Sequence, residues 1–212
     1  TIGKIWFEAD RTDEATGRRA WDFVIVDSPA TGHSLQYLSM PQAAFDTFTT
    51  GLVHREASRI VELLQDPERT GIVLVATAEE MPVNETLEMN RRLRRDLRLP
   101  SALLVVNRVH QPSVRASDAD ALAGALARGG ASRSEAERVF LGDVLRAARE
   151  ESGWIAINAR YLEKLRAGVS LPTVVLPFLF SEEFGLAQIR QLSGLLAASP
   201  AGNRKPRRKG AS

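Results

Sequence analysis

The chain has 212 residues, an apolar fraction of 44% and a formal net charge of only +2, which suit one sizeable globular domain. It contains no cysteine, so disulfides and thiolate metal sites within these residues are excluded, and a cytoplasmic location is expected. No apolar run reaches the roughly 18 residues of a transmembrane helix, and the first ten residues lack the apolar core of a signal peptide.

Four short apolar runs predict buried strands. The runs cover residues 23–26, 72–76, 103–106 and 174–179. Each is rich in Val, Ile and Leu and lacks polar alternation, which is typical of strands covered on both faces in a parallel sheet.

Helical patterns separate these strands. Ser39 begins a capping-box spacing, so a helix is expected to start there with Pro41 in its first turn. A second apolar stripe ends near residues 66–67. Asn84 is expected to cap a third helix, and we interpret its arginine-rich face at 91–95 as a solvated face rather than a binding patch.

The second half of the chain is predicted to be largely helical. A helical segment is expected around 115–168, with a capping box at Ser134 and Glu137 and with Gly168 closing it. The last helix is expected to start near Ser181. The alternation of strands and helices predicts an α/β fold with a mostly parallel sheet flanked by helices.

The predicted domain covers residues 1–198, and residues 199–212 form a basic tail. From residue 203 onward the tail carries five cations and no acid. We interpret it as a solvated, disordered segment, with contact to an anionic membrane surface as the alternative. No nucleic-acid partner is expected, because no aromatic residues interleave with the basic ones.

The segment from Trp21 to His33 carries the strongest chemical signal. An apolar run delivers Asp27 at its C-terminal end, where ligands bind in open α/β sheets. One carboxylate there can hold Mg²⁺ through a bound water. The small residues that follow can turn their backbone N–H groups toward a phosphate, and Gly32 permits a close approach.

This segment also carries a family resemblance. Asp27-Ser28-Pro29-Ala30-Thr31-Gly32-His33, followed by Leu35, Leu38 and Pro41, resembles the Asp-Thr-Ala-Pro-Thr-Gly-His-x-Leu-x-x-Leu-x-x-Pro signature of the anion-transporting ATPase family. That family includes arsenical pump-driving ATPases and the ATPases that target tail-anchored membrane proteins. Ser28 and the Pro29-Ala30 order depart from the signature.

The resemblance implies a function for the positions at which this stretch matches the signature. Asp27, Thr31, Gly32 and His33 would form the catalytic switch beside the phosphates of ATP, with Asp27 binding Mg²⁺ through water. For His33 the alternative is a turn residue without a catalytic role.

Three further stretches are similar to the family in the same order. Residues 75–86 resemble its Pro-Glu-x-Met-x-Val-x-Glu-Thr turn, 104–109 the strand whose terminal Asn faces adenine, and 175–180 the loop that packs on the base. The resemblance therefore implies that the nucleotide is bound by Asn107, Arg108, Pro177 and Phe178. The alternative for Asn107 is a strand cap. We interpret His54 and His110 as isolated surface or loop residues.

No Gly-x-x-x-x-Gly-Lys-[Ser/Thr] motif occurs in the 212 residues, and the first residue is Thr1 rather than Met. We therefore expect the chain to be the C-terminal part of a P-loop NTPase that is incomplete at its N-terminus. It would be inactive alone and would hydrolyse ATP as part of a full-length parent. The lack of cysteine disfavours a metalloid pump.

The leading hypothesis is an ATP-binding and ATP-hydrolysing switch that drives transport or targeting of an unknown protein or membrane client. The resemblance implies a homodimer or pseudo-dimer in the full-length protein. The helix near Phe45 and Phe48 and the helical segment are candidates for client contact. One alternative is a nonhydrolysing interaction module that keeps the fold. Another is a related partitioning or iron–sulfur-assembly ATPase.

Overall fold

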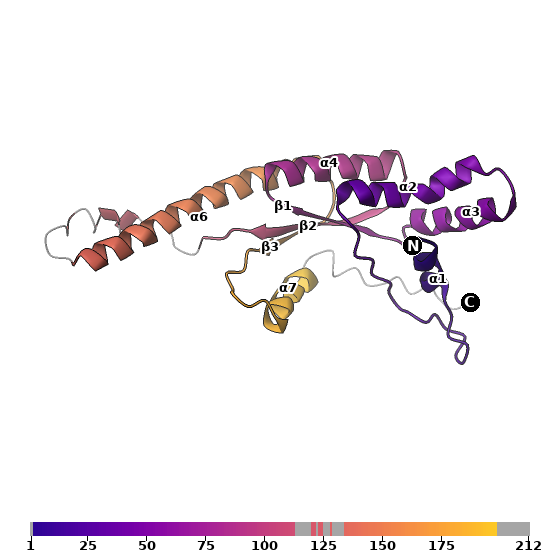
Figure 1. Cartoon of the computed structure of the whole chain (residues 1–212), viewed down its shortest axis with the longest axis horizontal. Coiled ribbons are helices and arrows are strands. Elements are labelled where there is room, and N and C mark those ends of the chain that lie inside the picture. Colours follow the sequence, from indigo (N-terminus) through magenta and orange to yellow (C-terminus); the bar gives the residue numbers. More distant parts are fainter. Residues whose placement is uncertain (1, 113–119, 122, 125–127, 129–133, 199–212) are drawn as a thin grey trace. The chain divides into compact units, whose positions relative to one another are not determined.

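The computed structural model describes residues 2–112, 120–121, 123–124, 128 and 134–198 (Figure 1). Its labelled elements are, in chain order, α1 (Ile2–Asp10), α2 (Thr31–Thr47), α3 (Gly51–Gln65), β1 (Ile72–Thr77), α4 (Glu80–Arg95), β2 (Ser101–Val109), α6 (Glu135–Gly168), β3 (Thr173–Pro177) and α7 (Leu186–Ala198). The strands form one parallel sheet in the order β1-β2-β3, flanked by helices. The predicted α/β fold is confirmed, and so are the strands expected at 72–76 and 103–106; the strand expected at 174–179 is confirmed as far as Pro177, where β3 ends.

The chain divides into two compact units. The first unit comprises Thr1–Leu74 and Asn84–Leu104, and the second comprises Val75–Val83 and Val105–Ser212. Strands β1 and β2 therefore each contribute residues to both units. The prediction of one domain over 1–198 stays a prediction, and the basic tail at 199–212 lies outside the described residues, as does most of 115–133.

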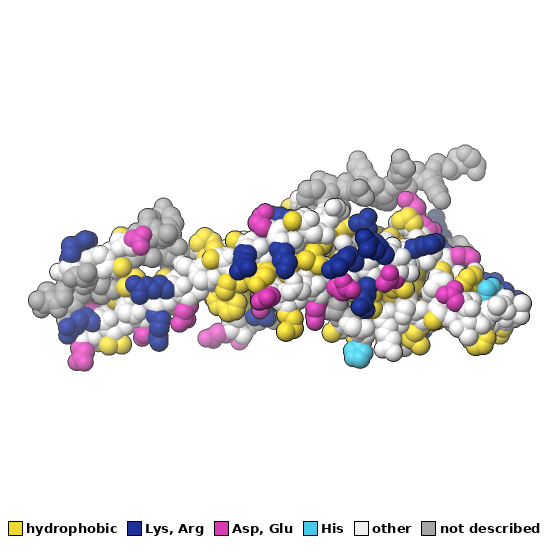
Figure 2. Space-filling model, turned by 90° about the horizontal axis from the view of Figure 1, so that it is seen from above, with side chains coloured by type: hydrophobic (Ala, Val, Ile, Leu, Met, Phe, Trp, Pro, Cys, Tyr) yellow, Lys and Arg dark blue, Asp and Glu magenta, His cyan; other side chains and the backbone are white. Residues whose placement is uncertain are grey.

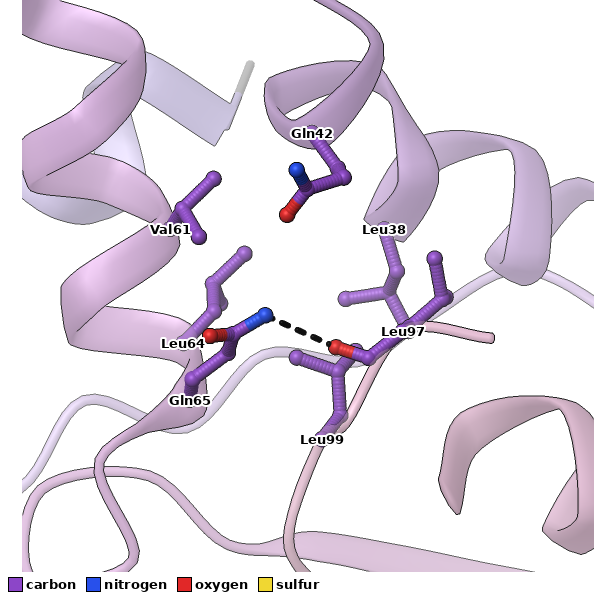
Figure 3. Close-up of a pocket in the computed structure, with 7 residues that line it drawn as sticks. All are labelled: Leu38, Gln42, Val61, Leu64, Gln65, Leu97 and Leu99. Atoms are coloured by element: carbon purple, nitrogen blue, oxygen red, sulfur yellow. Dashed lines mark hydrogen bonds between the residues drawn. The ribbon is translucent and has the colours of Figure 1, made fainter. Parts of the chain in front are cut away.

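In the first unit, helices α1, α2 and α3 pack on one another. Helix α3 buries Ala57 and Leu63, and α4 buries Leu93, which is 0% exposed. The Gln65 side chain at the end of α3 donates a hydrogen bond from Nε2 to the backbone oxygen of Leu97, at 3.0 Å (Figure 3). This bond joins the end of α3 to the turn that follows α4.

In the second unit, helices α6 and α7 lie on opposite sides of the strands, and α7 packs on β3 (Figure 1). The core of this unit includes Leu165 of α6, which is 0% exposed, and Val174 and Leu176 of β3. Alternate residues of β3 are the buried ones, as expected for a strand whose two faces are covered unequally.

The strand predicted at 23–26 is wrong. Residues 23–30 form neither helix nor strand, and the side chains of Phe23 and Ile25 are 87% and 93% exposed. A strand needs a neighbour for its backbone N–H and C=O groups, because unpaired groups cannot be buried without cost. No strand of the described residues pairs with this segment, so its high β-propensity is not sufficient. Asp27 accordingly follows an exposed extended segment, not a buried strand.

The helix predicted to start at Ser39 begins earlier. Helix α2 starts at Thr31, where the N–H groups of His33 and Ser34 donate to the oxygen of Ala30. Pro41 therefore lies inside the helix, where it removes one backbone hydrogen bond. The Ser39 hydroxyl donates to the oxygen of Gln36 instead of capping a helix.

Two other predicted helix starts are also wrong. Helix α4 starts at Glu80, four residues before Asn84, so Asn84 lies inside the helix and does not cap it. The acidic Glu80 in its first turn suits the positive end of the helix dipole. Helix α7 starts at Leu186 rather than near Ser181, because the Gln188 side chain accepts from the N–H of Gly185 and so closes the helix start there.

The second predicted capping box is confirmed. The Ser134 hydroxyl accepts from the N–H of Glu137 at 3.2 Å, and the Glu137 carboxylate accepts from the N–H of Ser134 at 2.9 Å. The predicted end of this helix at Gly168 is confirmed as well. The two bonds between Ser134 and Glu137 satisfy two donors that a helix start otherwise leaves without a partner.

Ser134→Ala is expected to lower the free energy of unfolding by about 1 kcal/mol, because both reciprocal bonds depend on Ser134 or its geometry. Urea unfolding followed by circular dichroism measures the effect. Ser152→Ala is the matched control, since the Ser152 hydroxyl bonds only within α6, to the oxygen of Ala148. Equal effects of the two substitutions would contradict the capping function.

A turn between α1 and α2 is organised by Asp13. Its carboxylate accepts from the N–H groups of Thr16 at 2.8 Å and Ala15 at 3.0 Å. The bond from the Thr16 backbone is the largest cause of a lowered pKa at Asp13. Because the folded-state pKa of Asp13 is depressed, its carboxylate stabilises the folded chain at neutral pH, and this stabilisation is lost as the pH falls through the folded-state pKa.

Candidate functional site

The predicted catalytic residues lie in the first unit, in the exposed segment and the helix that follows it. Asp27 is exposed and forms no ion pair with a described residue. Ala30 is the N-cap of α2, and Thr31, Gly32 and His33 form the first turn of that helix. The sequence thus places one unpaired carboxylate four residues ahead of a helix N-terminus, whose first N–H groups are available to an anion.

Ser34 holds this turn in place, and sequence reasoning missed it. Its hydroxyl lies 3.0 Å from that of Ser28 and donates to the backbone oxygen of Pro29. Ser34 is buried, so these contacts attach the residues after Asp27 to the first turn of α2. Serine is common near helix starts, so no specific sequence signal predicts this contact.

The predicted nucleotide-binding residues lie in the second unit, where β2 and β3 end. Asn107 and Arg108 are near the end of β2, Pro177 ends β3, and Phe178 follows it. The N–H of Phe178 donates to the oxygen of Val109 at 2.9 Å, so the two chain segments stay paired beyond β3. The Arg108 guanidinium carbon lies 5.3 Å from the centre of the Phe178 ring. The structure therefore brings Arg108 and Phe178 together.

Arg108 has a left-handed backbone conformation, with φ of 57°. This conformation is uncommon for a residue other than glycine and costs free energy. The Asn107 side-chain oxygen accepts from the Arg108 N–H at 2.9 Å, which satisfies the backbone donor at this position. The Asn107 oxygen is thus engaged by the backbone of β2, while its amide nitrogen keeps two donors.

His110 lies in an aromatic cluster and is not an isolated loop residue. Its ring stacks with Phe178, with centroids 4.7 Å apart and an interplanar angle of 10°, and with Trp154 at 5.8 Å and 16°. Phe180 contacts the rings of both His110 and Phe178 edge-on. The His110 Nδ1 atom is buried without a hydrogen-bond partner among the described residues. His54 is not isolated either, because its ring stacks on Phe45.

Asn158 of α6 connects this cluster to the ends of two strands. Its Oδ1 accepts from the N–H of His110 at 2.8 Å, and its Nδ2 donates to the oxygen of Ala78 at 3.0 Å. Asn158 is 3% exposed. His110, Trp154 and Asn158 lie far from Phe178 in sequence and belong to no motif, so the sequence carried no signal that would group them with it.

Two hollows lie in the first unit. One, of about 10 Å³, is lined by Leu38, Gln42, Val61, Leu64, Gln65, Leu97 and Leu99 (Figure 3). It has room for about one water molecule and is too small for a ligand. The other is an open groove of about 610 Å³ between α1, α2 and α3, lined mainly by apolar side chains that include Met40, Leu52 and Val53. None of the predicted catalytic residues lines either hollow.

The arginine-rich face of α4 is solvated, as predicted. Arg91 and Arg92 are exposed and share the carboxylate of Glu88, at 3.3 and 2.9 Å. Figure 2 shows basic and acidic side chains interspersed on the visible face. In the described part of the chain, no group of three or more His, Cys, Asp or Glu side chains could hold a metal ion. None of its helices is long and apolar enough to cross a membrane.

Comparison with known proteins relates the chain to ATPases. No protein-family model matches it. It is 30% identical over 187 residues to ATPase BagA of Mycobacterium tuberculosis, covering 84% of the chain and 53% of that protein. A Mycobacterium bovis protein that is also named an ATPase has the same identity to the chain over the same number of residues. The arsenical pump-driving ATPase of Escherichia coli is 37% identical over 83 residues, which cover 34% of the chain and 13% of that protein.

These relatives support an ATPase family at modest identity. The chain spans about half the length of the mycobacterial relatives. The names of the relatives thus agree with the class of protein that the Asp27 to His33 string resembles.

Proposed function

We propose that this chain is part of an ATP-binding and ATP-hydrolysing switch protein that drives transport or targeting of a client. The meeting of Arg108 and Phe178 where β2 and β3 end is the observation that carries this proposal. In parallel α/β sheets, ligands bind beyond the carboxyl ends of the strands. The names of the relatives supply the chemical class of the ligand, a nucleoside triphosphate.

The second unit provides the proposed binding surface for the base. Phe178 belongs to an aromatic cluster with His110 and Phe180, against which a planar purine can pack, and Asn107 offers amide donors to its edge. Pro177 fixes the backbone ahead of Phe178. Arg108 lies over the Phe178 ring and supplies a permanent positive charge beside the bound nucleotide.

The first unit provides the proposed phosphate-side residues. Asp27 fits a Mg²⁺ ion, because its carboxylate is exposed and unpaired and Mg²⁺ needs only one or two carboxylates while it keeps several waters. When bound, Mg²⁺ would neutralise charge on the phosphates. At the start of α2 the N–H groups of Thr31 and Gly32 can donate to an anion, whereas the N–H of His33 donates to the oxygen of Ala30.

A phosphate-binding lysine of the P-loop type is not among the 212 residues. Hydrolysis is therefore proposed for a protein that joins this chain to such a loop, and base binding for the chain itself. The homodimer, the client, the cytoplasmic location and the client contacts near Phe45 and Phe48 stay predictions.

Isothermal titration of the 212-residue chain with adenosine tests this proposal, because a nucleoside needs no phosphate cradle. Saturable binding that is weakened about tenfold by Asn107→Ala is expected, since one purine hydrogen bond is worth about that much. Gln191→Ala is the control, because Gln191 is exposed on α7. An absence of adenosine binding, or equal binding by both variants, would contradict the proposed base site.

A further inference from the structure

Asn158 binds two chain segments that lie far from it in sequence. One is the His110 N–H, at the end of β2, and the other is the Ala78 oxygen, just after β1. Ala78 is 1% exposed, so its oxygen is removed from water. A buried carbonyl that loses its donor costs free energy, and the same is true of a buried N–H that loses its acceptor.

Only a side-chain amide serves both partners. Asn offers an acceptor oxygen and a donor nitrogen on one short, planar group. A leucine of similar volume offers neither, and a serine hydroxyl is too short to replace both bonds at the same backbone positions. The identity of residue 158 is therefore tied to these two bonds and not only to packing.

The same face of α6 also contacts the His110 ring. Trp154 lies four residues before Asn158, so both side chains project from one face of the helix. Trp154 stacks on the His110 ring while Asn158 binds the His110 backbone. Helix α6 thus fixes both the backbone and the ring plane of His110.

His110 in turn determines the surroundings of the proposed base site. It follows Arg108 by two residues, and its ring stacks on Phe178 at 4.7 Å. A shift of the His110 backbone would move the Asn107 and Arg108 strand end relative to the Phe178 ring. The distance between an amide that reads the purine edge and the ring that stacks on it would then change.

We propose that Asn158 is a positioning residue for purine recognition: it holds His110, and through His110 the separation between Asn107 and Phe178. This inference rests on the proposed function, because it concerns the base side of the same site. It assigns to α6 a part in choosing the base, through contacts that do not touch the nucleotide.

The experiment measures the preference for adenosine over guanosine by titration of the full 212-residue chain. Asn158→Leu removes both bonds at similar volume and is expected to reduce the preference about tenfold. Asn158→Ser is the second variant if Asn158→Leu does not fold, and the same direction is expected. Amide hydrogen exchange at His110 is expected to accelerate in both variants, which reports the lost bond independently of any nucleoside.

Leu165→Val is the matched control, because Leu165 is a fully buried residue of the same helix. It is expected to lower the melting temperature and leave the preference unchanged. If the unsubstituted chain binds adenosine and guanosine equally, or if the folded Asn158 variants keep the wild-type preference, the positioning function is overturned while the proposed function stands. If the unsubstituted chain binds neither nucleoside, the proposed function fails, and this inference fails with it.

Discussion

Asp27→Asn is expected to lower Mg²⁺-dependent ATP hydrolysis by about 10²–10³-fold in the protein that joins this chain to a phosphate-binding loop. The amide keeps the size of the side chain and removes the negative charge that the proposed Mg²⁺ site requires. Phosphate release at saturating ATP and Mg²⁺ measures the effect. The fold is expected to be unchanged, because Asp27 is exposed and makes no ion pair with a described residue.

The matched control is Asp22→Asn. Asp22 lies in the same exposed segment, five residues before Asp27, so the two substitutions remove the same charge from similar surroundings. Hydrolysis near the wild-type rate is expected for Asp22→Asn. Equal rates for the two variants would show that the charge at Asp27 has no specific function.

Leu93→Ala is expected to lower the free energy of unfolding by about 2–5 kcal/mol. Leu93 is 0% exposed in the first unit, so the substitution removes buried methyl groups and leaves a cavity that the surroundings fill only in part. Chemical denaturation measures the loss. Leu52→Ala is the control, because Leu52 is 64% exposed and a change within about 0.5 kcal/mol is expected there. Equal losses would contradict the described core.

The strands β1, β2 and β3 could be predicted because their apolar runs also pair with one another in the structure. The predicted cover on both faces is wrong for β1, since Val73 and Val75 are 50% and 63% exposed. Residues 23–26 have the same composition but no pairing partner among the described residues. The composition of a segment shows only that it can adopt a strand conformation, whereas strand formation also needs a neighbouring strand that can be distant in sequence. The sequence could not supply that second condition.

One predicted helix start is correct and another is wrong, for a similar reason. The Ser134 capping box was predictable because both of its bonds lie within four residues. At Ser39 the same spacing fails, because α2 has already started at Thr31 and continues through Pro41. A local pattern predicts a helix start only where no earlier turn has formed.

The proposed base site is predicted from resemblance. Asn107, Arg108, Pro177 and Phe178 are its predicted residues, and the structure places Arg108 against Phe178. The supporting contacts were not accessible, because Asn158 and His110 are 48 residues apart. Neither residue belongs to a motif, and only the fold makes them neighbours.

Photo-crosslinking with an azido-adenine ATP analogue marks the residues that contact the base. We expect labelled peptides that contain residues 107–110 or 177–180, with labelling suppressed by unlabelled ATP. Labelling confined to the groove between α1, α2 and α3, or labelling that ATP does not suppress, would contradict the proposed base site.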